Sequence, residues 1–183
     1  MTSDSSSPPS RVRLDQWKPG NLDRGRGACV EALWVLVKCA FFLGPFPWPS
    51  CLRVALLRLF GARVGRGVVN KPQVHIYFPW KLEIGDHTWI GYEVFLYNVD
   101  RITIGSHCCL SQRAFLCTGN HNYKLPTMDD INAPITVCDG AWIGAQTFVG
   151  PGVTVGVDAV VAAGSVVTKD LPAGMVCSGV LWS

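Results

Sequence analysis

The stretch Val137–Pro172 repeats with a period of six residues, and this period limits the fold more than any other feature of the chain. Its six hexads read VCDGAW, IGAQTF, VGPGVT, VGVDAV, VAAGSV and VTKDLP. Each hexad begins with Val or Ile, four carry Gly or Ala second, and five carry a small or β-branched residue fifth. Helices repeat at 3.6 residues and strands at 2.0, so a period of six indicates a solenoid.

The hexads predict an all-β solenoid, a parallel β-helix. We expect the opening aliphatic residue to point inward, the small fifth residue to pack where the wall turns, and the second-position glycine to relieve crowding at the bend. Further hexads begin at Val64, Ile84, Ile90, Ile104, Leu110 and Leu116. The step from Leu116 to Val137 is about 15 residues longer than one hexad, which predicts a protruding loop at residues 120–134.

The remaining segments complete a chain whose 183 residues suit one domain. Residues 1–27 are polar and predict a flexible N-terminal arm. Residues 28–61 predict a helical segment: one helix over Ala28–Leu43 and a second over Cys51–Phe60, with Ser50 as its N-cap and Gly61 as its stop. The β-helix is expected over residues 62–172, followed by a short C-terminal tail at 173–183.

The helical segment has two interpretations. It either caps the solenoid or makes peripheral membrane contact, because its apolar runs are too short to span a bilayer. Residues 1–81 hold 12 Lys and Arg against 4 Asp and Glu, which suits an anionic surface. Nucleic acid is not an expected partner, since no aromatic-and-basic motif accompanies this charge. The eight cysteines form no C-x-x-C pair, which predicts reduced, mostly buried thiols in a cytoplasmic protein, membrane-associated in the second interpretation.

The chemistry is expected where the repeat is broken. His121 stands at the entrance to the long loop, and an imidazole can act as a general base near neutral pH. A lone histidine is more often a solvated surface residue. The position of this one, directly before the insertion, favours a catalytic role.

The hexads, the segment LCTGNHNY and the run GAWIGAQTFVGPGVTVGVDAVVAAGSVVTKDLPAG resemble the hexapeptide-repeat (left-handed β-helix) O-acetyltransferases. The nearest group is the colanic acid biosynthesis-type exopolysaccharide acetyltransferases. The resemblance covers roughly residues 11–179. It implies a left-handed β-helix, a homotrimer, acetyl-CoA as acyl donor in grooves between neighbouring solenoids, a sugar or glycan-intermediate acceptor, and no metal.

The resemblance also implies roles for particular residues. His121 would take the proton from an acceptor hydroxyl, which attacks the thioester directly without an acyl-enzyme. The acceptor would be contacted by Asn98, Asp100, Asn120, Asn122 and Tyr123. Acetyl-CoA would be held by Trp142 beside the thioester arm, by small residues that let the pantetheine approach (Gly144, Ala145, Ala162, Ala163 and Gly164), and by Lys169 near the nucleotide phosphates.

Two departures from the family pattern leave alternatives open. Relatives often carry Asp after the Gly-Asn-His motif, where this chain has Asn122, so we expect a less well oriented histidine. Relatives also continue past the Val176–Val180 region with a basic segment that touches CoA, and this sequence ends in SGVLWS. A non-catalytic scaffold is therefore a second hypothesis. A zinc enzyme of the γ-carbonic-anhydrase type is a third, in which His87 and His107, one coil apart, would stack on an outer corner.

Overall fold

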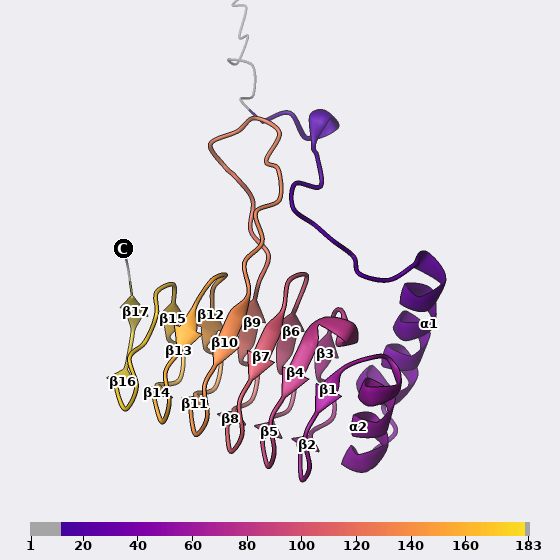
Figure 1. Ribbon diagram of the computed structural model, residues 1–183, viewed down its shortest axis with the longest axis vertical. Helices are drawn as coiled ribbons and strands as arrows, with labels where there is room; N and C mark the ends of the chain where they lie inside the picture. The colour runs from indigo at the N-terminus through magenta and orange to yellow at the C-terminus, as the bar shows by residue number, and fades with distance from the viewer. Residues whose placement is uncertain (1–11, 182–183) are drawn as a thin grey trace, which may run out of the picture.

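The structure is a computed structural model that describes residues 12–181, and these residues form a parallel β-helix with a helical cap (Figure 1). The chain passes through three parallel sheets in turn, once per coil. Sheet A contains β1 (Arg63–Val64), β4 (Leu82–Ile84), β7 (Ile102–Ile104), β10 (Ile135–Val137) and β13 (Thr154–Val155). Sheet B contains β2 (Val69–Asn70), β5 (Trp89–Ile90), β8 (Cys109–Leu110), β11 (Trp142–Ile143), β14 (Val160–Val161) and β16 (Val176–Cys177). Sheet C contains β3 (His75–Ile76), β6 (Phe95–Tyr97), β9 (Phe115–Cys117), β12 (Phe148–Val149), β15 (Val166–Val167) and β17 (Val180–Leu181).

The inward positions of the hexads form the core. The opening aliphatic residues are completely buried: Val137, Ile143, Val149, Val155, Val161 and Val167. The fifth residues are buried as well: Ala141, Thr147, Val153, Ala159 and Ser165. The predicted solenoid and its inward stacks are therefore confirmed.

The second-position glycines relieve crowding, as expected, while the left-handed backbone of the bends falls on another position of the hexad. The fourth hexad residue, rather than the second, takes a left-handed backbone, with φ of 72°, 57°, 80°, 55° and 71° at Gly140, Gln146, Gly152, Asp158 and Gly164. The second-position glycine is needed because neighbouring coils approach closely. A Cβ at Gly144 would lie 2.6 Å from the backbone nitrogen of Ala163 in the next coil.

The solenoid continues past residue 172, the end that the hexads predict. Val176 of β16 pairs with Val160, and Val180 of β17 pairs with Val166. The described part of the segment expected as a tail thus completes a further turn, in which Val176 is exposed and Cys177 is buried, as in the sheet B strands before it.

Two helices close the first coil (Figure 1). α1 (Ala28–Lys38) runs into a π-helical turn, η2 (Cys39–Leu43), so the single helix predicted over 28–43 changes its winding before Gly44 and Pro45. α2 spans Ser50–Leu59. The Trp34 side chain is buried and donates from Nε1 to the Ile76 carbonyl at 3.1 Å, and Leu57 is also fully buried. The helices therefore cap the solenoid, in a packing that leaves Leu33, Leu36 and Leu59 exposed.

Ser50 does not cap α2, contrary to the prediction. The helix begins at Ser50 itself after Pro49, without a side-chain cap, and the Ser50 hydroxyl instead accepts the Asn70 N–H at 2.8 Å. Gly61 ends the helical segment with φ of 95°, as expected. The hydroxyl therefore ties the helix to the first coil.

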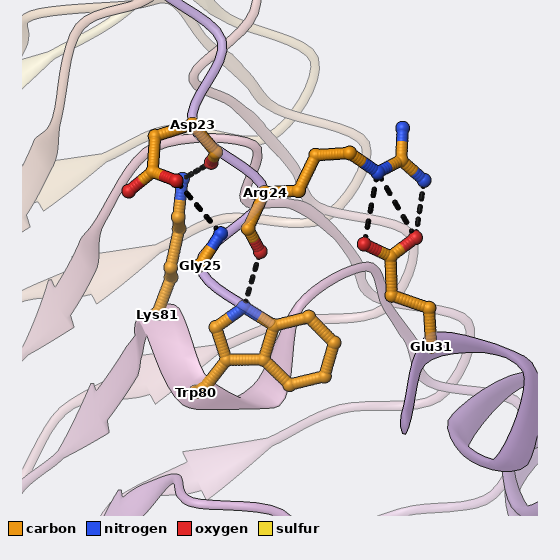
Figure 2. A network of polar contacts seen from close by, with 6 residues as sticks. All are labelled: Asp23, Arg24, Gly25, Glu31, Trp80 and Lys81. Atoms are coloured by element: carbon orange, nitrogen blue, oxygen red, sulfur yellow. Dashed lines mark hydrogen bonds and ion pairs between the residues drawn. The ribbon is translucent and has the colours of Figure 1, made fainter. Parts of the chain in front are cut away.

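Residues 12–27, predicted to be a flexible arm, make specific contacts. They include η1 (Leu14–Gln16) and run along the solenoid towards the long loop (Figure 1). The Arg13 N–H donates to the Pro126 carbonyl in that loop at 2.7 Å. Near the cap, the Trp80 indole in η3 (Pro79–Lys81) donates to the Arg24 carbonyl at 2.8 Å (Figure 2). The arm thus bridges the cap and the loop.

The cysteines are less buried than predicted. Cys108 and Cys177 are buried, but Cys29, Cys39 and Cys51 in the helical segment are exposed.

Within residues 12–181, no helix has both the length and the apolar content to cross a membrane.

Candidate active site

The long loop leaves the solenoid between β9 and β10 and folds back on itself at its base. His121 and Asp130 form an antiparallel bridge. On either side, the Asn122 N–H donates to the Asp129 carbonyl at 2.8 Å, and the Ile131 N–H donates to the Asn120 carbonyl at 2.9 Å. This short ladder places an acid nine positions downstream directly opposite the candidate base.

The His121 ring is oriented by two acceptors. Its Nδ1 lies 3.0 Å from Asp130 Oδ1 and 2.9 Å from the Met128 carbonyl oxygen. A carboxylate and a carbonyl can only accept, so Nδ1 carries the proton of the neutral imidazole and Nε2 carries the lone pair. The Asp130 side chain is 12% exposed and that of His121 53% exposed. The largely buried Asp130 carboxylate therefore orients the solvent-accessible ring of His121.

A cavity of about 110 Å³ lies beside this pair, lined by Leu22, Tyr97, Val99, Gly119, Asn120, His121, Asp130 and Asn132. Burial is the main cause that raises the pKa of Tyr97, so its phenol stays protonated at neutral pH. A Cβ at Gly119 would lie 2.7 Å from the Tyr97 ring. The glycine of the Gly-Asn-His motif is thus required by this close approach.

The residues next to His121 shape the backbone of the loop entrance. Asn120 Oδ1 accepts the His121 N–H at 2.8 Å, and Asn122 Oδ1 accepts the Lys124 N–H at 3.2 Å. Tyr123 is 75% exposed. We expected that the missing acid at position 122 would leave the histidine poorly oriented. Asp130 supplies a carboxylate instead, and it does so across the base of the loop, where no sequence motif next to His121 marks it.

The two acceptor residues predicted on the preceding coil separate in the structure. Asn98 is fully buried, its Oδ1 accepting the N–H groups of Tyr77 and Phe78 at 3.0 Å and its Nδ2 donating to the Phe78 carbonyl at 2.6 Å. Its predicted contact with an acceptor is wrong, because the amide is occupied inside the bend. Asp100 lines a second cavity next to that of His121.

The residues predicted to hold acetyl-CoA lie at two corners of the solenoid. Gly144 and Ala145 follow β11, and Ala162–Gly164 follow β14 in the same corner one coil later, where the Gly164 N–H donates to the Ala145 carbonyl at 2.8 Å. Trp142 is half exposed on sheet B and donates from Nε1 to Ser111 Oγ at 2.8 Å. Lys169 follows β15 at the other end of sheet C, the corner from which the His121 loop also emerges. One chain alone does not bring all of these residues together.

The histidines outside the loop do not build a metal site. His87 and His107 stack as predicted, with ring centroids 5.3 Å apart and planes at 21°. Over residues 12–181, no group of three or more His, Cys, Asp or Glu is placed to hold a metal ion. A catalytic zinc site needs three protein ligands, so this stacked pair supplies too few.

Comparison with known proteins decides the family. The Escherichia coli protein assigned as colanic acid biosynthesis acetyltransferase WcaF is 43% identical over 160 residues, which cover 85% of this chain and 86% of that protein. The chain belongs to the hexapeptide-repeat acetyltransferases. No family model matches the sequence.

Solved structures agree with this assignment. The hexapeptide-repeat acetyltransferase VCA0836 of Vibrio cholerae, complexed with acetyl-CoA, superposes with a TM-score of 0.76 at 28% identity, over 90% of this chain and 91% of that one. A galactoside acetyltransferase in complex with coenzyme A gives a TM-score of 0.73 at 25% identity, over 82% and 76% of the two chains. The resemblance to the hexapeptide-repeat acetyltransferases that the sequence predicts is therefore confirmed.

Proposed function

We propose that this acetyltransferase moves acetyl from acetyl-CoA to a hydroxyl group of a sugar in exopolysaccharide biosynthesis. The names of the relatives support the reaction class: one is assigned to colanic acid biosynthesis, and two solved relatives hold acetyl-CoA or coenzyme A. The observation that carries the proposal is the His121–Asp130 pair, whose geometry leaves a lone pair at the rim of a cavity.

The proposed mechanism uses His121 as the general base. Nε2 takes the proton of the acceptor hydroxyl while the hydroxyl oxygen attacks the thioester carbonyl. The tetrahedral intermediate then collapses, the carbon–sulfur bond breaks, and the thiolate of CoA takes the proton from the imidazolium. An alcohol is a weak nucleophile, and a placed base contributes about 10²–10⁴-fold to such a step. The adjacent Asp130 carboxylate stabilises the imidazolium while it exists.

A homotrimer is part of the proposal, because the three outer faces of the solenoid differ. The outward residues of sheet A are polar: Arg63, Glu83, Thr103, Thr136 and Thr154. Those of sheet B are mostly apolar: Val69, Trp89, Cys109, Trp142, Val160 and Val176. Those of sheet C are aromatic or apolar: His75, Phe95, Phe115, Phe148 and Val166. A closed ring needs two different contact faces per chain, and a neighbour on such a face would enclose the groove that acetyl-CoA requires.

We also propose that the protein is cytoplasmic and that its helical segment touches the membrane surface. Leu33, Leu36 and Leu59 are 54%, 68% and 78% exposed on the cap. An apolar hollow between Val30, Leu33 and Leu59 is flanked by Arg26. Exposed leucines beside a cation suit an anionic lipid surface. The change Leu36→Glu should reduce co-sedimentation with anionic liposomes, and unchanged co-sedimentation would argue against membrane contact.

The deciding experiment compares acetyl transfer from acetyl-CoA to a panel of sugars by the wild type and His121→Ala. We expect His121→Ala to lose about 100-fold or more in kcat, because it lacks the base. His107→Ala is the matched control, since it removes a histidine from an outer corner, and it should keep the wild-type rate. A wild type that neither binds CoA nor transfers acetyl would favour the non-catalytic scaffold. Equal activity of His121→Ala would rule out this mechanism.

A further inference from the structure

A second cavity adjoins the His121 cavity and has no role in the mechanism above. It measures about 200 Å³ and is lined by Asn21, Asp23, Lys81, Asp100 and Arg101. The two cavities share Val99 and Asn132 as lining residues. A ligand that fills the first cavity therefore lies directly beside the second.

The N-terminal arm forms one wall of both cavities and is fixed to the catalytic loop. Asn21 Nδ2 donates to the Asn132 carbonyl at 2.9 Å, and the Asn132 N–H donates back to Asn21 Oδ1 at 2.9 Å. Gly20 has φ of 53°, and a Cβ there would lie 2.0 Å from the Asp130 carbonyl oxygen. Glycine thus allows the arm to press against the strand that carries the acid.

The other end of the wall is fixed to the solenoid (Figure 2). The Lys81 ammonium donates to the Asp23 carbonyl in the arm and to the Val99 carbonyl in the solenoid, the latter at 2.6 Å. Arg24 pairs with Glu31 at the start of α1. Because hydrogen bonds hold this segment of the arm at both ends, it forms a fixed wall of the cavity.

The charges around the second cavity select the chemistry of its ligand. The lining contains two carboxylates, Asp23 and Asp100, and two cations, Lys81 and Arg101, so its formal charges cancel. Arg101 also pairs with Glu83 outside this cavity. Each carboxylate uses Oδ1 for a backbone N–H, of Gly25 and Arg101 respectively. A phosphate would meet both carboxylates, and an acyl chain would leave the polar groups without partners. A neutral ring with several hydroxyl groups can donate to the acids and accept from the cations.

We infer that this cavity is a second acceptor subsite, which binds a neutral hydroxylated ring linked to the ring that is acetylated at His121. The inference rests on the proposed sugar acceptor and narrows it to an acceptor of at least two sugar units. The arm is then part of the acceptor site, although it lies about 100 residues before the catalytic loop in the sequence.

The test uses matched pairs of a monosaccharide and a disaccharide: galactose with lactose, and glucose with maltose. The dissociation constants are measured by calorimetry with full-length protein and CoA, and kcat/KM is measured with acetyl-CoA. We expect at least one disaccharide to be preferred about tenfold or more over its monosaccharide, because a second ring adds hydrogen bonds to charged groups. Arg101→Ala should reduce this preference to about twofold or less.

Arg63→Ala is the matched control. Both Arg63 and Arg101 pair with Glu83, but Arg63 lines a separate hollow next to Arg58. The control should keep the wild-type preference. Equal affinity of the wild type for both members of each pair, or an equal loss of preference in both variants, would overturn the second subsite. Binding with the expected preference but without acetyl transfer would instead contradict the proposed function.

Discussion

At the scale of single residues, Asp130 determines which nitrogen of His121 can act as a base. Its carboxylate and the Met128 carbonyl both accept from Nδ1, which leaves the lone pair on Nε2. Asp130→Asn can present an amide N–H to Nδ1 and so favour the opposite tautomer. We expect this variant to lose about 100-fold in kcat, with little change in its affinity for acetyl-CoA, as measured by steady-state kinetics and calorimetry.

Asn122→Ala provides the control for Asp130→Asn. Asn122 follows His121 directly, but its Oδ1 accepts the Lys124 N–H within the loop. This control should stay near the wild-type kcat. A loss of activity in Asn122→Ala equal to that in Asp130→Asn would mean that loop folding, and not the tautomer of His121, limits the reaction.

The cysteines should differ in reactivity. Burial raises the pKa of the Cys108 thiol to about 11 and also raises that of Cys177. A raised pKa lowers the thiolate fraction at any pH below it, so only about 0.1% of Cys108 is thiolate at pH 8. Iodoacetamide at pH 8 should modify the exposed Cys29 and Cys51 first, and Cys108 only after unfolding. Peptide mass spectrometry checks the order, and early modification of Cys108 would contradict it.

How far the site could be predicted depends on where each signal lies in the sequence. The sequence singles out His121 as the candidate base because it stands where a regular repeat is interrupted. Asp130 was missed because its proximity arises from the return of the loop, and no local pattern states which residue will pair across a hairpin base. For Asn98 the sequence suggests the wrong role. A polar residue near a corner of the solenoid could bind a ligand, but Asn98 is buried and its amide hydrogen-bonds to the backbone of the bend.

At the scale of elements, strand β2 contains a buried asparagine, Asn70, whose side chain makes no hydrogen bond. It is the only such asparagine in the described part of the chain. Asn70 is fully buried in register with Ile90, and both its Nδ2 and its Oδ1 have no hydrogen-bond partner. A buried polar group without a partner costs about 1–3 kcal/mol. Asn70→Val should therefore raise the free energy of unfolding by about 1 kcal/mol or more, as measured by urea denaturation.

Asn98→Val is the matched comparison for Asn70→Val. Asn98 is equally buried, but its amide makes three hydrogen bonds to the backbone of Tyr77 and Phe78. Its replacement should lower the free energy of unfolding by about 2–3 kcal/mol, because the buried N–H and carbonyl of Phe78 lose their partner. The Tyr77 N–H keeps the Leu96 carbonyl as an acceptor. If Asn70→Val proved equally destabilising, Asn70 would have a bound partner, such as a buried water.

The elements themselves were largely predictable. A hexad forces the same residue into the same place on every coil, so the sheets, the inward stacks and the loop followed from the spacing alone. The ends were not predictable in this way. The π-helical turn after α1 and the last strands, β16 and β17, depend on packing against the neighbouring coil, and the tail departs from the hexad register that would have revealed it.

At the scale of the whole molecule, the outer faces predict how copies of the chain assemble. Val160 on the apolar face of sheet B and Thr136 on the polar face of sheet A each lie on a strand that is paired on both sides, and both are partly exposed. Val160→Lys would place a charge in the proposed interface, so we expect it to dissociate the trimer and lower acetyl transfer together. Thr136→Lys adds the same charge to a face expected to remain in water and should stay trimeric. Sedimentation velocity checks both variants, and a Val160→Lys protein that remains trimeric would exclude sheet B from the interface.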